Sequence, residues 1–150
     1  MRRIIDATRL DDWFTSTRRD AQELLPDLIR RLITATIPID ALLQLRIPVG
    51  DQIGTPGYDG QVQTVSIHPH VPMGQSVWEM GVGDPKKKAD EDYTKRIRNP
   101  RGVDLEDTVF VFVTPHQWNG KDDWSAQKKS EGMWKDIKVL DVSDLECWLD

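Results

Sequence analysis

Two acidic residues and a run of lysines in the middle of this 150-residue chain have the types and spacing of a hydrolytic site. Asp59 follows a turn-forming sequence, and Glu79 lies inside an apolar stretch between large apolar neighbours. Three consecutive lysines, Lys86, Lys87 and Lys88, come shortly afterwards. A carboxylate in an apolar strand must be paired, reach water at a strand edge, or bind a cation. The alternatives are therefore a metal-dependent nuclease centre and a charged surface beside an ordinary β-hairpin.

The two acids suit Mg²⁺, which prefers hard oxygen ligands and is held in hydrolytic sites by a few carboxylates. Asp59 and Glu79 have the same parity along two predicted neighbouring strands, so both side chains can project from one face of a sheet. They stand directly opposite each other only if the connecting turn is centred near Pro69, whereas a loop extending through Met73 would offset them. The Pro and Gly residues of this segment favour the longer loop, which weakens the metal-site hypothesis.

Charge is distributed unevenly along the chain. A net charge of −5 and a pI near 5.2 argue against a protein that coats nucleic acid with its whole surface. Residues 86–101 nevertheless contain seven basic and three acidic residues. Such a run is either a solvated helix face or a surface that contacts phosphates. The second interpretation gives these candidate nucleic-acid-binding residues: Lys86, Lys87, Lys95, Arg96 and Arg98.

Length and composition indicate one compact domain over residues 1–150, because a chain of this size buries about two thirds of its unfolded surface in a single core. The sequence shows no signal-peptide pattern and no apolar run long enough to cross a bilayer, so we expect a soluble, cytoplasmic protein with no membrane partner. The single cysteine, Cys147, excludes an internal disulfide and a cysteine-based zinc site. Its apolar helical surroundings predict a buried thiol.

Hydrophobic periodicity predicts the secondary structure. A helical lead-in within residues 1–23, visible from residue 11, precedes an amphipathic helix that begins near residue 24 and tolerates Pro26 in its first turn. The elements that follow are strands at 42–49, 61–67 and 76–82, a helix at 86–98, a strand at 108–115, a helix at 124–133, a strand at 137–141 and a terminal helix. Three strands in succession form an antiparallel meander, and the strand-helix-strand crossovers after them predict an α/β fold with a mixed sheet and helices on both faces.

Other residues with chemical potential are assigned less specific roles. His68 and His70 flank a proline in a predicted turn and lack a nearby third ligand, so we expect them to be solvent-exposed rather than metal-bound. Trp118 and Trp124 lie in a loop-like segment where exposed rings could stack on bases. The other tryptophans, Trp13, Trp78, Trp134 and Trp148, are predicted to be core residues. The sequence contains no Gly-rich phosphate-binding loop of the nucleotide-binding kind.

Six segments occur in a fixed order along nearly the whole chain: "LPDLIRRLI", "PGYDG", "VPMGQSVWEMG", "KKKADEDYTKR", "FVFVTPHQW" and "WKDIKVLDVSDLECWL". Together they resemble a bacterial family of restriction-endonuclease-like domains within the PD-(D/E)xK superfamily. Domains of that family are found in antiphage defence proteins and are often fused to NACHT-type or other ATPase modules. The resemblance implies a restriction-endonuclease-like fold, in which a helix precedes a three-stranded meander that is followed by a helix and a strand.

By this resemblance Asp59 is the first metal-binding acid and Glu79 the second, with Mg²⁺ or Mn²⁺ as the cofactor. The superfamily places a lysine two residues after the second acid, and this chain has Gly81 there. A lysine supplied from the following helix is one explanation, with Lys88 as the first candidate and Lys87 and Lys86 behind it. Loss of catalysis is the other explanation.

The resulting hypothesis is a Mg²⁺-dependent endonuclease that cleaves double-stranded DNA in antiphage defence, with Asp59, Glu79 and Lys88 as its catalytic residues. The alternative is a catalytically silent copy of the fold that recognises nucleic acid or protein within a defence complex. A fused or separate NACHT or ATPase sensor module is the partner that the resemblance implies, and the sequence leaves homo-oligomer formation open. The two hypotheses differ in whether a lysine amine reaches the space between Asp59 and Glu79.

Overall fold

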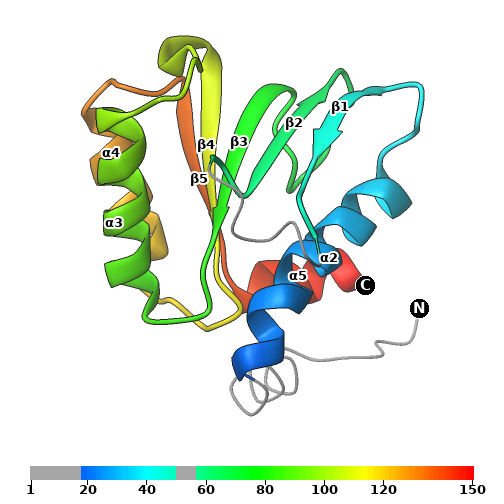
Figure 1. Ribbon diagram of the computed structural model, residues 1–150, viewed down its shortest axis with the longest axis horizontal. Helices are drawn as coiled ribbons and strands as arrows, with labels where there is room; N and C mark the ends of the chain where they lie inside the picture. The colour runs from blue at the N-terminus through cyan, green and yellow to red at the C-terminus, as the bar shows by residue number, and fades with distance from the viewer. Residues whose placement is uncertain (1–17, 50–56) are drawn as a thin grey trace.

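The computed structural model describes residues 18–49 and 57–150, with side chains described from residue 22 onward. This part of the chain forms a five-stranded mixed sheet with helices on both faces (Figure 1), which confirms the predicted α/β class. The elements are α2 (Arg18–Thr36), β1 (Leu42–Arg46), β2 (Gly60–Thr64), β3 (Gly74–Met80), α3 (Pro85–Arg98), a 3₁₀ turn (Leu105–Asp107), β4 (Thr108–Val113), α4 (Lys121–Ser130), β5 (Asp136–Leu140) and α5 (Val142–Leu149).

The strand order in the sheet is the same as the order in the chain, from β1 to β5. The first three strands are antiparallel and form the predicted meander. The last three are parallel, with α3 connecting β3 to β4 and α4 connecting β4 to β5. All six residues of β4 are buried, as expected for a central strand that is covered on both faces.

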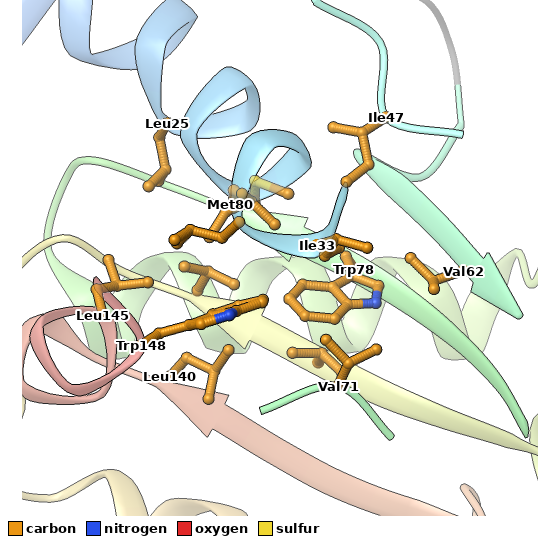
Figure 2. Packing of buried hydrophobic residues seen from close by; sticks show 14 of the residues in the cluster. Leu25, Ile33, Ile47, Val62, Val71, Trp78, Met80, Leu140, Leu145 and Trp148 are labelled. Carbon is orange, nitrogen blue, oxygen red and sulfur yellow. The ribbon is translucent and has the colours of Figure 1, made fainter. Parts of the chain in front are cut away.

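Each face of the sheet has its own apolar cluster, because successive side chains of a strand point to opposite faces. On the face of the sheet that α2 and α5 cover, Trp78 of β3 packs in a cluster that includes Ile33 of α2 and Leu145 of α5 (Figure 2). On the α3–α4 side, Val77 of β3 belongs to a second cluster together with Tyr93 of α3. Glu79 shares the parity of Val77 and therefore faces α3.

The ends of the helices follow from local sequence. Asp84 accepts a hydrogen bond from the Lys87 backbone N–H at 3.2 Å, and Pro85 occupies the first turn of α3, so the predicted start of this helix is confirmed. Pro26 differs from the prediction, because α2 begins at Arg18 and the proline lies in its interior. The helical lead-in before residue 18 lies outside the described residues. None of the described helices has the length and apolar character needed to span a membrane.

Three side chains differ from the sequence prediction in their burial. Cys147 is exposed, because α5 turns Val142, Leu145 and Trp148 toward the core and leaves the cysteine on its outer side. Trp124 is buried rather than exposed, and its indole N–H donates to Asp90 Oδ1 at 2.8 Å. Trp118 is partly buried against the apolar cluster on the α3–α4 side, which also contains Trp124. Trp13 lies outside the described residues.

The two histidines of the β2–β3 loop are partly buried rather than fully solvent-exposed. The ring centroids of His68 and His70 each lie 5.3 Å from that of Trp148. Nδ1 of His68 also accepts hydrogen bonds from the backbone N–H groups of His70 and Val71, at 3.0 and 3.2 Å. These contacts hold the loop in a compact shape against α5.

Candidate functional site

The register of β2 and β3 places the two candidate metal-binding acids opposite each other. Gly60 pairs with Trp78, and one further step along this register brings Asp59 to Glu79. The turn is therefore centred on residue 69, so the offset that a longer loop would cause is not present. The Asp59 Oδ2 atom accepts a hydrogen bond from the Met80 backbone N–H at 2.8 Å, which ties the aspartate to the strand that carries the glutamate.

Glu79 is bound by a buried arginine of α3. The Arg96 Nε atom donates to Glu79 Oε1 at 2.5 Å, and Arg96 Nη2 donates to the Gly57 carbonyl oxygen at 2.6 Å. The guanidinium also lies over the Tyr58 ring, 4.4 Å from its centroid. Arg96 therefore joins Glu79 to the segment that immediately precedes Asp59.

This role of Arg96 differs from the expectation that it contacts nucleic acid. The residue is only 2% exposed, and its guanidinium is enclosed by Glu79, Gly57 and Tyr58. A group in that position does not reach a phosphate at the protein surface. The other basic residues proposed for such contacts stay on the outside of α3: Lys86, Lys87, Lys95 and Arg98 are exposed.

Burial controls the protonation of Glu79. Loss of hydration, together with the negative charges of Asp59 and Asp92, raises the pKa of Glu79 from 4.5 to about 9, against the opposing influence of Arg96. The side chain is 3% exposed, so water does not relieve the repulsion between these carboxylates. A bound cation would relieve it.

The raised pKa predicts how stability depends on pH in metal-free protein. A carboxyl group whose pKa is higher in the folded than in the unfolded state stabilises the fold fully below its unfolded pKa, and this contribution is lost as pH rises through the folded pKa. We therefore expect the unfolding free energy of the parent, relative to that of Glu79→Gln, to fall between pH 5 and pH 9 with a slope of about 1.4 kcal/mol per pH unit. Urea denaturation in EDTA across this range measures the difference, and a difference independent of pH would contradict the assignment.

Lys88 occupies the space above Gly81. A Cβ atom added at Gly81 would collide with the Lys88 Cγ atom and would lie 3.1 Å from Cδ and Cε. The aliphatic part of Lys88 therefore fills the place where the side chain of a lysine on the strand would begin. The Lys88 side chain packs so closely on Gly81 that any larger residue at position 81 would displace it.

The ammonium group of Lys88 is held by a buried carboxylate. Lys88 Nζ donates to Asp92 Oδ1 at 3.1 Å. Burial alone would lower the pKa of Lys88, but the ion pair with Asp92 and the negative charges of Asp59 and Glu79 outweigh it and raise the pKa above 10.5. Lys88 is therefore a permanent cation at neutral pH, within the electrostatic range of both acids.

Asp92 is a member of the site that the sequence interpretation missed. It is 4% exposed, and its Oδ2 atom is buried without a hydrogen-bond partner in the described part of the chain. Burial raises its pKa, and Lys88 opposes that rise. Lys88, Asp92 and Arg96 are four residues apart, so they share one face of α3. That spacing, with alternating charge, is the sequence signal that could have identified Asp92 and Arg96 as site residues.

The donor set of this site is compatible with a Mg²⁺ or Mn²⁺ ion. Asp59 Oδ1 and Glu79 Oε2 have no protein donor among the described residues, and the pKa of Glu79 is raised by burial and by the negative charges of Asp59 and Asp92. Mg²⁺ in proteins is commonly held by one or two carboxylates and completes its shell with water and substrate oxygens. Within residues 18–49 and 57–150, no group of three or more His, Cys, Asp and Glu side chains is arranged to hold a metal ion. That absence gives no support to a metal centre, and Asp59 and Glu79 are the two carboxylates that could contribute ligands to an ion here.

Comparison of the chain with protein families, with curated protein sequences and with solved structures gives no match. The proposal that follows therefore depends on the geometry of the site and on the resemblance of the six sequence segments.

Proposed function

We propose that this chain is a restriction-endonuclease-like domain that hydrolyses phosphodiester bonds of double-stranded DNA with Mg²⁺ or Mn²⁺. The observation that carries the proposal is the position of Lys88. Its side chain lies over Gly81, two residues after Glu79, where the superfamily pattern calls for a lysine. The register that brings Asp59 opposite Glu79 supports the same assignment.

Each residue of the site has a distinct role in this proposal. Asp59 and Glu79 would hold the metal ion, which supplies Lewis-acid polarisation of a phosphate oxygen and a more acidic bound water. The ammonium of Lys88 stabilises negative charge that develops on the phosphate and orients the attacking water. Asp92 holds that ammonium in place, and Arg96 fixes the carboxylate of Glu79.

One observation favours a second candidate function. The Arg96 guanidinium already provides a positive charge to Glu79 Oε1, and in a catalytically silent fold that charge would stand permanently in place of a metal ion. Such a domain would recognise nucleic acid or protein without cleaving it. In either case, the resemblance suggests a role in antiphage defence, with an ATPase sensor module as the regulatory partner.

The two functions are separated by a cleavage assay. We expect single-turnover cleavage of linear and supercoiled DNA in Mg²⁺ or Mn²⁺ at low salt, and none in EDTA. The assay includes high protein concentration and a fused oligomerisation tag, so that a requirement for oligomerisation or for a fused sensor module does not hide activity in the isolated chain. A parent protein that is inert under all these conditions would favour the silent fold.

Metal binding provides a test that does not depend on activity. Asp59→Ala leaves a single carboxylate, which is too few to hold a strongly hydrated divalent ion. We expect calorimetric titration with Mn²⁺ to detect one site in the parent and none in Asp59→Ala. Asp123→Ala, which removes an exposed carboxylate from α4, is the matched control and should bind like the parent. Equal affinity in parent and Asp59→Ala would rule out this pair of ligands.

A further inference from the structure

Three glutamines form a row across the meander on the face of the sheet that carries the acids. Gln63 of β2 pairs with Gln44 of β1 on one side and with Gln75 of β3 on the other. Paired residues of adjacent strands project to the same face. Gln44 and Gln63 are exposed and Gln75 is partly exposed, and none of their side chains has a hydrogen-bond partner in the part of the chain that is described. We call these three residues the glutamine row.

The glutamine row lies on the same strands as the candidate catalytic acids. Gln63 and Asp59 have the same parity in the chain, and so do Gln75 and Glu79. Between the row and the acids, the exposed Arg46 pairs with Gln61. Four residues of β-strand span about 13 Å. That distance corresponds to about four base pairs of B-form DNA, so one duplex can contact both places.

The charge of this surface suits a polyanion. Residues 41–49 and 60–78 contain no Asp or Glu, although the whole chain has 25 acidic residues. Arg46 contributes a positive charge beside the row. Within these two strand segments, a nucleic acid would meet no carboxylate before it reaches Asp59 and Glu79.

We propose that the glutamine row binds the duplex whose phosphodiester bond lies at Asp59 and Glu79. This inference depends on the proposed function. A glutamine amide both donates and accepts hydrogen bonds, so it can contact phosphate oxygens or the edges of bases. The unpartnered amides and the acid-free strands together favour DNA as the occupant over an acidic or apolar protein surface.

The test is duplex binding measured by fluorescence anisotropy in EDTA, so that cleavage does not interfere. We expect the triple variant Gln44→Ala, Gln63→Ala, Gln75→Ala to weaken binding about tenfold or more without changing the salt dependence, because an uncharged amide releases no counterion. We expect Gln63→Lys to tighten binding several-fold and to increase the salt slope by about one. Gln127→Lys, an exposed position on α4, is the control and should match the parent. Circular dichroism and thermal melting verify that each variant is folded.

The outcomes separate this inference from the nuclease proposal. If the parent binds and cleaves DNA but the glutamine variants bind DNA as the parent does, the glutamine row does not bind the duplex and the nuclease proposal stands. If the variants change binding but the parent never cleaves, the surface stands and the silent fold is favoured. Absence of duplex binding in the parent, or binding of single-stranded RNA alone, would overturn the surface as a duplex-binding site.

Discussion

Lys88→Ala is expected to reduce the rate of single-turnover DNA cleavage about a hundredfold or more, while the affinities for Mn²⁺ and for duplex DNA stay close to those of the parent. The reason is that the Lys88 ammonium acts on negative charge that develops only in the transition state, and loss of one preorganised electrostatic contact of this kind has an effect of that size. Cleavage is measured with excess enzyme in Mg²⁺ and in Mn²⁺, and both affinities are measured separately.

Two further variants make this prediction specific to the position of the amine. Lys129→Ala removes an exposed lysine from α4 and should change cleavage by less than a few-fold. The double variant Gly81→Lys, Lys88→Ala moves the lysine back to the strand, into the space that Lys88 vacates, and should restore part of the activity. Unchanged cleavage in Lys88→Ala would remove this residue from the catalytic mechanism.

The strands of this protein were predictable from the sequence, but the register that assembles the site was not. Alternating and continuous apolar patterns identify β1 to β5 because each pattern reflects which faces of a strand are covered. The position of Asp59 opposite Glu79 depends instead on the conformation of the β2–β3 loop. That loop is compact because His68 accepts two backbone N–H groups, and its composition does not reveal this.

The charged residues of α3 show a second limit of sequence analysis. The local composition indicated one solvated or phosphate-binding surface, yet the helix divides its charges between two environments. Asp92 and Arg96 are buried against the sheet, whereas Lys87 and Lys95 are exposed. Charge runs are interpreted as solvated because an isolated buried charge is very unfavourable. Here the charges are buried together, and that arrangement depends on Glu79, which lies far away in the sequence.

The buried ion pair of Arg96 leads to the largest stability effect that we expect. Arg96→Met removes the cation that faces Glu79 and also both hydrogen bonds that join β3 to the Gly57 segment. Removal of one partner of a buried ion pair costs about 3–5 kcal/mol, because the remaining group is left without compensation. Arg98→Met, at an exposed position of the same helix, should change stability by about 0.5 kcal/mol or less. Urea denaturation in EDTA above pH 9, where the Glu79 carboxylate is charged in the folded protein, measures both, and equal losses in the two variants would contradict a structural role for the pair.

A double-mutant cycle shows which part of Arg96 is responsible for this loss. If the cost comes from the uncompensated Glu79 carboxyl, Glu79→Gln should recover much of the stability lost in Arg96→Met, because a neutral amide needs no cation. If the cost comes from the bond between Arg96 Nη2 and the Gly57 carbonyl oxygen, Glu79→Gln should recover nothing. Arg96→Lys distinguishes the two further, since it keeps the positive charge but lacks the planar fork that binds both groups at once. The second outcome would mean that Arg96 chiefly positions Asp59, and Mn²⁺ affinity should then fall in Arg96→Lys even though Glu79 retains a cationic neighbour.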